Sequence, residues 1–406
     1  MDMAKPIIRF KGYQDDWEQR KLGELAEIVG GGTPSTSVDS YWDGDIDWYA
    51  PAEIGEQIYL KSSQRKITEE GLNKSSAKVL PVGTVLFTSR AGIGKTAILL
   101  KEGCTNQGFQ SIVPNKDKLD SYFIFTRSEE LKRYGEIVGA GSTFVEVSGK
   151  QMANMELMMP TTMDEQQKIG GYFSNLDHLI TLHQRKCDET KRLKKYMLQK
   201  MFPQNGEKVP EIRFSGFTDD WEQRKLSEIA LQTYGGGTPK TANEEFWKGN
   251  IPWIQSSDLI EERLFNVKPR KYISQEAISK SSTKLVPQNS IAIVTRVGVG
   301  KLAFMPFSYA TSQDFLSLSE LKIEPEFAVY ALYKMMRLVS NEVQGTSIKG
   351  ITKDELLAKE ILIPDCEEQK KIGAYLHNLD HLITLHQREL ENLQNIKKFM
   401  LGKMFV

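Results

Sequence analysis

EQQKIGGYFSNLDHLITLHQR (165–185) returns as EQKKIGAYLHNLDHLITLHQR (368–388), with 17 of 21 positions identical. A second block repeats at nearly the same distance, because IRFKGYQDDWEQRKL (8–22) matches IRFSGFTDDWEQRKL (212–226) at 12 of 15 positions. Between these blocks the two copies diverge widely. A period of about 204 residues is far too long for a solenoid and indicates a duplicated domain. We therefore expect two halves, each a variable globular part followed by a nearly invariant tail.

Both tails have the periodicity of long helices, because their apolar residues recur in steps of three and four over nearly forty residues. At 1.5 Å per residue each helix would be roughly 60 Å long, and Asp164 is a plausible cap of the first. So narrow a stripe cannot stabilise a helix alone, so we expect the two tails to pair as an antiparallel coiled coil. The stripe residues are Ile169, Tyr172, Leu176, Ile180, His183, Leu193, Met197 and Met201, then Ile372, Tyr375, Leu379, Ile383, His386, Leu390, Leu393, Ile396, Met400 and Met404.

The variable parts, about 13–160 and 217–364, have mixed α/β character. Runs such as Val85–Thr88 and Ile291–Thr295 predict strands, and the segments near 119–134 and 325–342 predict helices. The expected class is α+β: two mixed α/β domains separated by two long helices, duplicated about a pseudo-two-fold axis. The predicted boundaries are 1–160 and 204–364 for the domains, and 161–203 and 365–406 for the helices.

The bulk composition is that of an ordinary globular protein. The chain has 406 residues and no net charge, with 53 Lys+Arg against 53 Asp+Glu, which leaves a local basic groove possible. No apolar run is long enough to span a bilayer, and the N-terminal segment lacks a secretory apolar region. Three scattered cysteines do not make a disulfide framework and fit a reducing compartment, so we expect a cytoplasmic protein.

The segment Ala91–Thr96, AGIGKT, resembles the end of a phosphate-binding loop. The first glycine of that motif would have to stand where Ser89 does, and the second copy has Leu302 in place of the magnesium-binding hydroxyl. The following residues, 97–100, favour a strand, whereas a phosphate site needs a helix N-terminus. We favour a glycine-rich turn between strands, which could present Arg90 and Lys95, or Arg296 and Lys301, to a nucleic-acid backbone.

Two further motifs suggest metal chemistry and fail on spacing. Pro364-Asp365 before Glu368-Gln369-Lys370 imitates a nuclease signature, but the stretch opens a helix, where acidic residues favour the macrodipole. His377 and His381 stand four residues apart, but Asn378 replaces the glutamate of the zinc-protease motif. The pairs His178/His183 and His381/His386 have no cysteine or acidic cluster to complete a site, so helix packing is the favoured interpretation. We predict no catalytic residue and no metal ligand in this chain.

Binding chemistry remains, since both halves carry polar side chains suited to base edges and phosphates on expected loops. The same residue types recur in phase in the two halves. The basic stretch Arg185–Lys195 is either a solvated helix face or a path for phosphate. The predicted DNA-binding residues are Thr33, Ser89, Arg90, Lys95, Gln107 and Thr143 in the first half, and Thr238, Thr295, Arg296, Lys301, Gln313 and Lys349 in the second.

These motifs together resemble the specificity subunit of type I restriction–modification systems. The resemblance covers the whole chain and rests on DDWEQRKLGEL, on the two GGGTP segments, on TSRAGIGK with VTRVGVGK, and on the EQQKIG/EQKKIG and LDHLITLHQR helices. It implies two target-recognition domains, residues 1–160 and 204–364, that each read half of a bipartite double-stranded DNA sequence. The helices would form the spacer that sets the gap between the half-sites.

The resemblance also implies a subunit without catalytic activity or a cofactor of its own. It would position two modification (methyltransferase) subunits that use S-adenosylmethionine, and recruit restriction subunits that use ATP and Mg. Two alternatives stay open at this point. One is a coiled-coil scaffold without sequence-specific DNA binding, and the other is a nucleotide-binding protein that uses Gly94-Lys95-Thr96.

Overall fold

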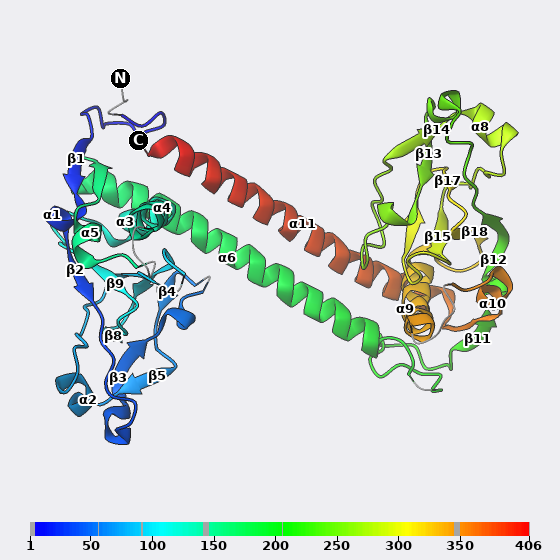
Figure 1. The fold of residues 1–406 in the computed structure, drawn as a ribbon. Helices are drawn as coiled ribbons and strands as arrows, with labels where there is room; N and C mark the ends of the chain where they lie inside the picture. The colour runs from blue at the N-terminus through cyan, green and yellow to red at the C-terminus, as the bar shows by residue number, and fades with distance from the viewer. Residues whose placement is uncertain are drawn as a thin grey trace. The chain divides into compact units, whose positions relative to one another are not determined.

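A computed structural model describes residues 5–55, 57–90, 92–140, 146–204, 206–344 and 350–405. The chain divides into two compact units: unit 1 is Met1–Gln184 with Arg388–Val406, and unit 2 is Arg185–Gln387. Two long helices, α6 (Met163–Lys200) and α11 (Cys366–Met404), each contribute to both units (Figure 1). In the described part of the chain, no helix is long and apolar enough to cross a membrane.

Unit 1 is built on a five-stranded sheet with the order β2-β9-β6-β7-β4, a three-stranded sheet β5-β3-β8 and the pair β1-β10. The strands are β1 Glu18–Lys21, β2 Ala26–Gly30, β3 Trp42–Tyr49, β4 Tyr59–Leu60, β5 Arg65–Ile67, β6 Val85–Phe87, β7 Thr96–Leu99, β8 Cys104–Thr105, β9 Gln110–Pro114 and β10 Glu156–Met159. Its short helices are α1 Leu22–Leu25, α2 Glu69–Asn73, α3 Ser121–Thr126, α4 Ser128–Gly139 and α5 Gly149–Ala153.

Unit 2 repeats this topology with the sheets β12-β18-β15-β16, β14-β13-β17 and β11-β19. Its strands are β11 Glu222–Lys225, β12 Ala230–Gly235, β13 Ile251–Ile254, β14 Lys271–Ile273, β15 Ser290–Val294, β16 Leu302–Met305, β17 Ala310–Thr311, β18 Phe315–Leu321 and β19 Glu360–Ile363. The helices are α7 Leu226–Ile229, α8 Gln275–Lys280, α9 Pro325–Gln344 and α10 Lys353–Ala358. Apart from β4, which has no counterpart in the described part of unit 2, the strand orders correspond, so the duplication seen in the sequence is also a duplication of fold.

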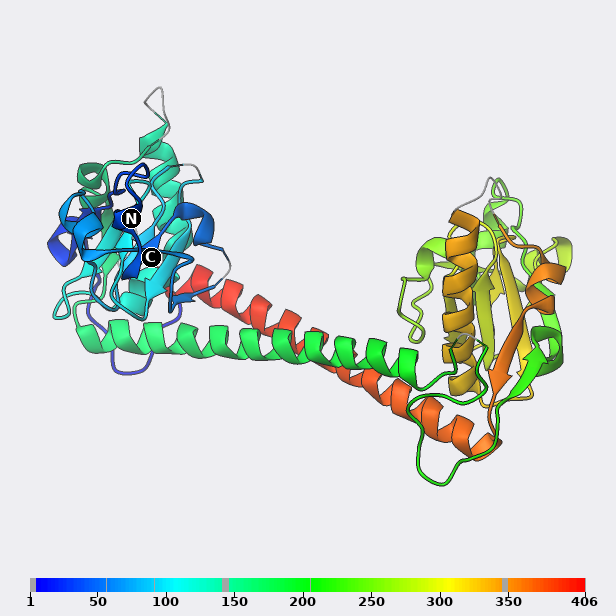
Figure 2. The same ribbon diagram turned by 90° about the horizontal axis from the view of Figure 1, so that it is seen from below.

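The central strands β6 and β15 separate two apolar cores in each unit. In β15, Ile291 and Ile293 pack into the core that contains α9, whereas Ala292 and Val294 face a second core. This alternation is the two-residue period of a strand whose two faces are both covered, and it explains the continuous apolar run. Figure 2 shows α9 lying along the main sheet of unit 2. The strands predicted from Val85–Thr88 and Ile291–Thr295 and the helices predicted near 119–134 and 325–342 are confirmed.

In unit 1 the first part of α6 packs against the last part of α11. Apolar side chains of both segments join one buried cluster, among them Phe173 and Leu393. The buried carboxylate of Asp177 accepts a hydrogen bond from the hydroxyl of Tyr122 at 2.9 Å and lies 2.6 Å from the ammonium of Lys397. The Asp177 carboxylate therefore links α6 both to α11 and to α3 of the globular part.

Unit 2 has a similar network, in which the aspartate and the lysine stand at the corresponding positions of the repeat and the tyrosine comes from a different position. Asp380 of α11 lies 2.6 Å from the ammonium of Lys194 of α6 and accepts a hydrogen bond from Tyr330 of α9 at 2.6 Å. Burial, followed by the nearby Asp380 charge, raises the pKa of the Tyr330 hydroxyl, so Tyr330 remains a donor. In both networks the aspartate comes from one tail and the lysine from the other.

The buried stripe of the tails differs in part from the predicted one. Leu193 and Ile396, predicted to pack, are 40% and 45% exposed, whereas the neighbouring Lys194 is buried. The stripe follows the seven-residue steps from Ile180 to Cys187 and Lys194, so a charged residue occupies a core position because Asp380 neutralises it. Asp164 is not the cap that we predicted, since α6 begins at Met163 and the Thr162 hydroxyl accepts the amide of Glu165 at 3.4 Å.

A partly buried arginine anchors the segment in front of each globular part to its tail helix. Arg9 makes two hydrogen bonds to the Glu165 carboxylate, at 2.6 and 2.8 Å, and Arg213 makes two to Glu368, both at 2.8 Å. The carboxylate of Asp365 accepts the amides of Glu367 and Glu368, so it caps the first turn of α11. The nuclease-like motif near Asp365 is therefore the start of a helix, as predicted.

Replacing Arg9 by alanine should lower the free energy of unfolding of unit 1 by about 3 kcal/mol, because it leaves the buried Glu165 carboxylate without its partner. Urea denaturation followed by circular dichroism measures the change. The matched control is Arg20→Ala, which removes an exposed pair with Glu24 and should leave the midpoint unchanged. Equal midpoints for the two variants would contradict the anchoring role of Arg9.

Candidate nucleic-acid interface

The GGGTP segments form tight loops that follow β2 and β12. In unit 1 the amide of Gly32 donates to the Thr105 carbonyl at 2.8 Å, and a Cβ on Gly31 would lie 2.0 Å from the Asn106 carbonyl oxygen. In unit 2 the amide of Gly237 donates to the Thr311 carbonyl at 2.8 Å, and a Cβ on Gly236 would lie 1.8 Å from the Ser312 carbonyl oxygen. Only glycine permits this approach, so each loop is held against the segment that leads into β9 or β18.

A buried tryptophan fixes each loop from the other side. The indole of Trp48 donates to the Gly32 carbonyl at 2.8 Å, and that of Trp253 donates to the Gly237 carbonyl at 3.0 Å. A second tryptophan, Trp42 or Trp247, packs edge-on against the first. Each loop therefore has a defined position on a rigid aromatic support.

The hairpin loops β6–β7 and β15–β16 lie beside these segments. The amide of Ser89 donates to the Gly108 carbonyl at 2.8 Å, and the amide of Thr295 donates to the Asp314 carbonyl at 2.7 Å. Gly94 and Gly300 adopt φ of +94° and +103°, and strands β7 and β16 follow them. The interpretation of AGIGKT as a glycine-rich turn between strands is confirmed, because no helix follows that could bind phosphate at its N-terminus.

Three loops of unit 1 bring most of its predicted binding residues together. The hydroxyl of Thr33 donates to the side-chain oxygen of Gln107. A Cβ on Gly108 would lie 3.7 Å from Cγ of Arg90, so Arg90 lies beside the loop that carries Gln107. Arg90 also forms a partly exposed ion pair with Glu146 at 3.8 Å, and Lys95 is exposed on the hairpin. The side chain of Ser89 is buried, and Thr143 lies outside the described residues.

Unit 2 arranges the corresponding residues in the same way. Thr238 donates to the side-chain oxygen of Gln313 at 2.6 Å, and Arg296 is exposed on the hairpin. The ammonium of Lys301 donates to the Ser256 carbonyl at 3.4 Å. Thr295 is buried and donates to the Asp314 carbonyl at 3.0 Å, and Lys349 lies outside the described residues. The DNA-contacting role of all these residues stays a prediction.

A cation over the tryptophan pair is a feature of both units that the sequence did not single out. The guanidinium of Arg65 lies 3.6 Å from the ring centre of Trp42, and the ammonium of Lys271 lies 5.6 Å from that of Trp247. In unit 2, Lys271, Thr238 and Gln313 line one pocket of about 270 Å³. The sequence contained a signal for this feature, because each half has a basic residue at the same position of the repeat, two residues before Ile67 or Ile273.

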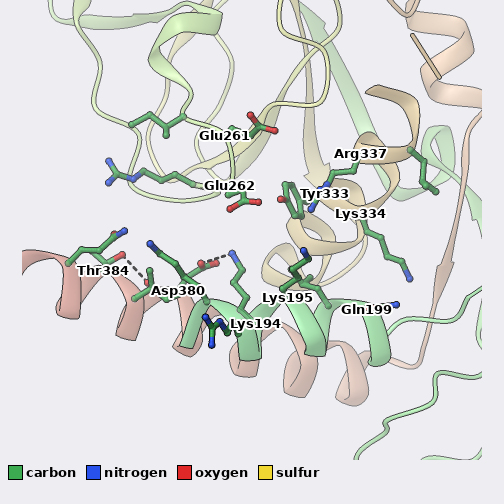
Figure 3. A pocket seen from close by; sticks show the side chains of 18 of the residues that line it. Lys194, Lys195, Gln199, Glu261, Glu262, Tyr333, Lys334, Arg337, Asp380 and Thr384 are labelled. Atoms are coloured by element: carbon green, nitrogen blue, oxygen red, sulfur yellow. Dashed lines mark hydrogen bonds and ion pairs between the residues drawn. The ribbon is translucent and has the colours of Figure 1, made fainter. Parts of the chain in front are cut away.

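A larger groove of about 730 Å³ lies elsewhere in unit 2, between α6, α9, α11 and the loop 260–263 (Figure 3). Besides the paired Lys194 and Asp380, its cations are Lys191, Arg192, Lys195, Arg263, Lys334 and Arg337, and its carboxylates are Glu261 and Glu262. Burial lowers the pKa of the Lys334 ammonium to about 8. Part of the predicted basic stretch of α6 thus lines a groove. At the equivalent positions of the second repeat, α11 has the uncharged residues Gln394 and Asn395 in place of Lys191 and Arg192.

Comparison with known proteins places the chain in a family. A model described as "Type I restriction modification DNA specificity domain" matches residues 14–192 and again 218–395. The chain therefore belongs to the type I restriction–modification DNA specificity family, as the motifs predicted. It has the function of a specificity subunit of such a system.

Individual relatives agree with this assignment. The chain is 27% identical to the MjaIX type I restriction enzyme specificity subunit of Methanocaldococcus jannaschii, over 96% of this chain and 92% of that protein. It is 28% identical to the EcoR124I/EcoR124II specificity subunit of Escherichia coli, over 43% of each. The crystal structure of a type I S subunit from M. genitalium covers 99% of both chains with a TM-score of 0.67, and at 13% identity it supports the fold.

Proposed function

We propose that the globular part of each unit reads one half of a bipartite duplex DNA target. The observation that carries this proposal is the duplicated loop cluster. In each unit a glycine-pinned GGGTP loop, a hairpin with exposed basic residues and a loop with an exposed glutamine converge. Basic and amide side chains presented together from rigid loops suit phosphate and base-edge contacts. Different residues surround the shared scaffold, so the two half-sites should differ in sequence.

We further propose that α6 and α11 pair antiparallel along their length and act as the spacer between the half-sites, related by a pseudo-two-fold axis. The networks Asp177–Lys397 and Asp380–Lys194 support this pairing, because the same two positions meet twice with the helices exchanged. Two backbone hydrogen bonds support the same exchange of helices. The amide of Ile8 donates to the Lys403 carbonyl of α11, and the amide of Ile212 donates to the Lys200 carbonyl of α6, both at 2.9 Å.

The chain itself would catalyse nothing and bind no cofactor. Two modification subunits would methylate adenine from S-adenosylmethionine, and restriction subunits would use ATP and Mg. A second apolar face of the tails supports protein partners, because it is exposed at matching positions of both helices. The matched, 40–56% exposed pairs are Leu179 and Leu382, Leu193 and Ile396, and Tyr196 and Phe399.

Exchange of residues 13–160 for the corresponding part of a relative tests independent readout. We expect one half of the methylation motif to change completely and the other half, with the gap, to stay as it was. Mapping methylated adenines in DNA from cells that carry the chimera measures this. The reciprocal exchange of 217–364 is the control and should change the other half. A chimera that alters both halves would refute independent readout, and a wild-type complex without sequence preference would refute the proposed function.

A further inference from the structure

Gln107 and Gln313 occupy the same place in the two units. Each follows a short strand, β8 or β17, that pairs in parallel with the strand carrying the buried tryptophan. Both side chains are exposed, and each receives a hydrogen bond from the threonine of the neighbouring GGGTP loop. The two threonine–glutamine pairs connect residues 74 and 75 positions apart. An arrangement that recurs in two otherwise divergent domains indicates a shared role.

The threonine contact leaves most of the amide available. Thr238 donates to the oxygen of Gln313, which keeps one lone pair and both N–H donors of the nitrogen. In the described part of the chain, neither amide nitrogen has a protein partner. Each glutamine thus presents an acceptor and a donor side by side to solvent. The close contacts of Gly31 and Gly236 hold the threonine in place, so the amide is oriented before any ligand arrives.

An oriented acceptor–donor pair matches one base edge in the DNA major groove. Adenine presents its N6 donor beside its N7 acceptor, whereas guanine presents two acceptors and would leave the glutamine oxygen opposed. We propose that Gln107 and Gln313 each read the adenine of one A·T pair, one in each half-site. In this proposal Thr33 and Thr238 are positioning residues that orient the two amides.

This inference rests on the proposed DNA-reading function and specifies one contact in each half-site. The test uses the full chain assembled with its modification subunits and a duplex pool randomised over both half-sites. Bound duplexes are sequenced without a methylation step, because methylation would itself demand an adenine. Wild-type binding should require an A·T pair at one position that Gln107 governs and at another that Gln313 governs.

Gln107→Ala should relax one A·T position of one half-site by roughly 5- to 150-fold, the discrimination of a bidentate contact. Gln313→Ala should relax one A·T position of the other half-site to a similar degree. Gln107→Glu should shift the preference at its position toward C·G, because a carboxylate accepts from the cytosine N4 amine. Both glutamines are exposed, so the variants should fold as the wild type does.

Thr33→Val removes the hydroxyl and keeps the shape of the side chain. It should weaken discrimination at the same position as Gln107→Ala and at no other, and Thr33→Ser should restore it. If the threonine only ties two loops together, the valine variant and the glutamine variants would leave the motif unchanged and alter thermal stability alone.

Three results would overturn the inference: relaxation at a position that is not A·T, uniform weakening at all positions, or an unaltered motif in Gln107→Ala and Gln313→Ala. Uniform weakening would mean that the glutamines contact the DNA backbone. A wild-type complex that binds all sequences equally would instead refute the proposed function, so the two failures are distinguishable.

Discussion

A fragment of residues 1–205 should sediment as a dimer. It contains one globular part and one tail whose partner helix is missing. In the whole chain Asp177 meets Lys397, and Asp380 meets Lys194 at the same two positions of the repeat. Two copies of the fragment can therefore reproduce both pairs, with Asp177 of each copy against Lys194 of the other. The product is an isologous dimer that should bind an inverted repeat of a single half-site.

Charge reversal makes this prediction specific. Asp177→Lys would place two like charges together at each of the two symmetric contacts, where loss of one buried pair costs about 3 kcal/mol. We expect at least a 100-fold weaker dimer in sedimentation equilibrium. The double variant Asp177→Lys with Lys194→Asp should recover dimerisation, because the pairs form again with exchanged signs. A monomeric wild-type fragment, or a double variant as weak as the single one, would contradict the helix pairing.

A heptad added to each tail should lengthen the preferred gap between half-sites by about three base pairs. The insertion extends a helix by roughly 10 Å, and DNA advances about 3.4 Å per base pair. HLITLHQ occurs identically at 178–184 and 381–387, immediately before the points where the two units divide. Duplication of this heptad in both helices keeps the buried stripe in register. Methylation of a site library with varied gaps measures the optimum.

The added base pairs also rotate one half-site by nearly a third of a turn. The coiled coil or the DNA must absorb that rotation, so some loss of affinity should accompany the longer gap. Duplication in one helix alone is the control and should disrupt pairing, because it displaces one stripe against the other. An unchanged optimum in an active double-insertion protein would show that these helices do not set the gap.

Most of the architecture could be predicted from local patterns in the sequence. Direct repeats indicated the duplication, and a stripe in steps of three and four indicated α6 and α11, because helical periodicity depends only on residues a few positions apart. The apolar runs of β6 and β15 were recognised for the same reason. The stripe was misassigned at Leu193, because the buried position belongs to Lys194. The lysine can be buried only because it pairs with the carboxylate of Asp380, which is far away in the sequence.

The composition of the candidate site was decided by the tertiary structure. Thr33 and Gln107 are far apart in the chain and meet only because strand pairing brings their loops to one place, as it does for Thr238 and Gln313. The same pairing buries the side chains of Ser89 and Thr295 and places Arg65 over Trp42. The sequence alone determined the duplication and the long helical tails, because internal repeats and helical periodicity can be recognised without the fold, and the resemblance of its motifs to a known family indicated a specificity subunit. Which side chains converge depends on sheet register between distant segments, and no local pattern encodes that register.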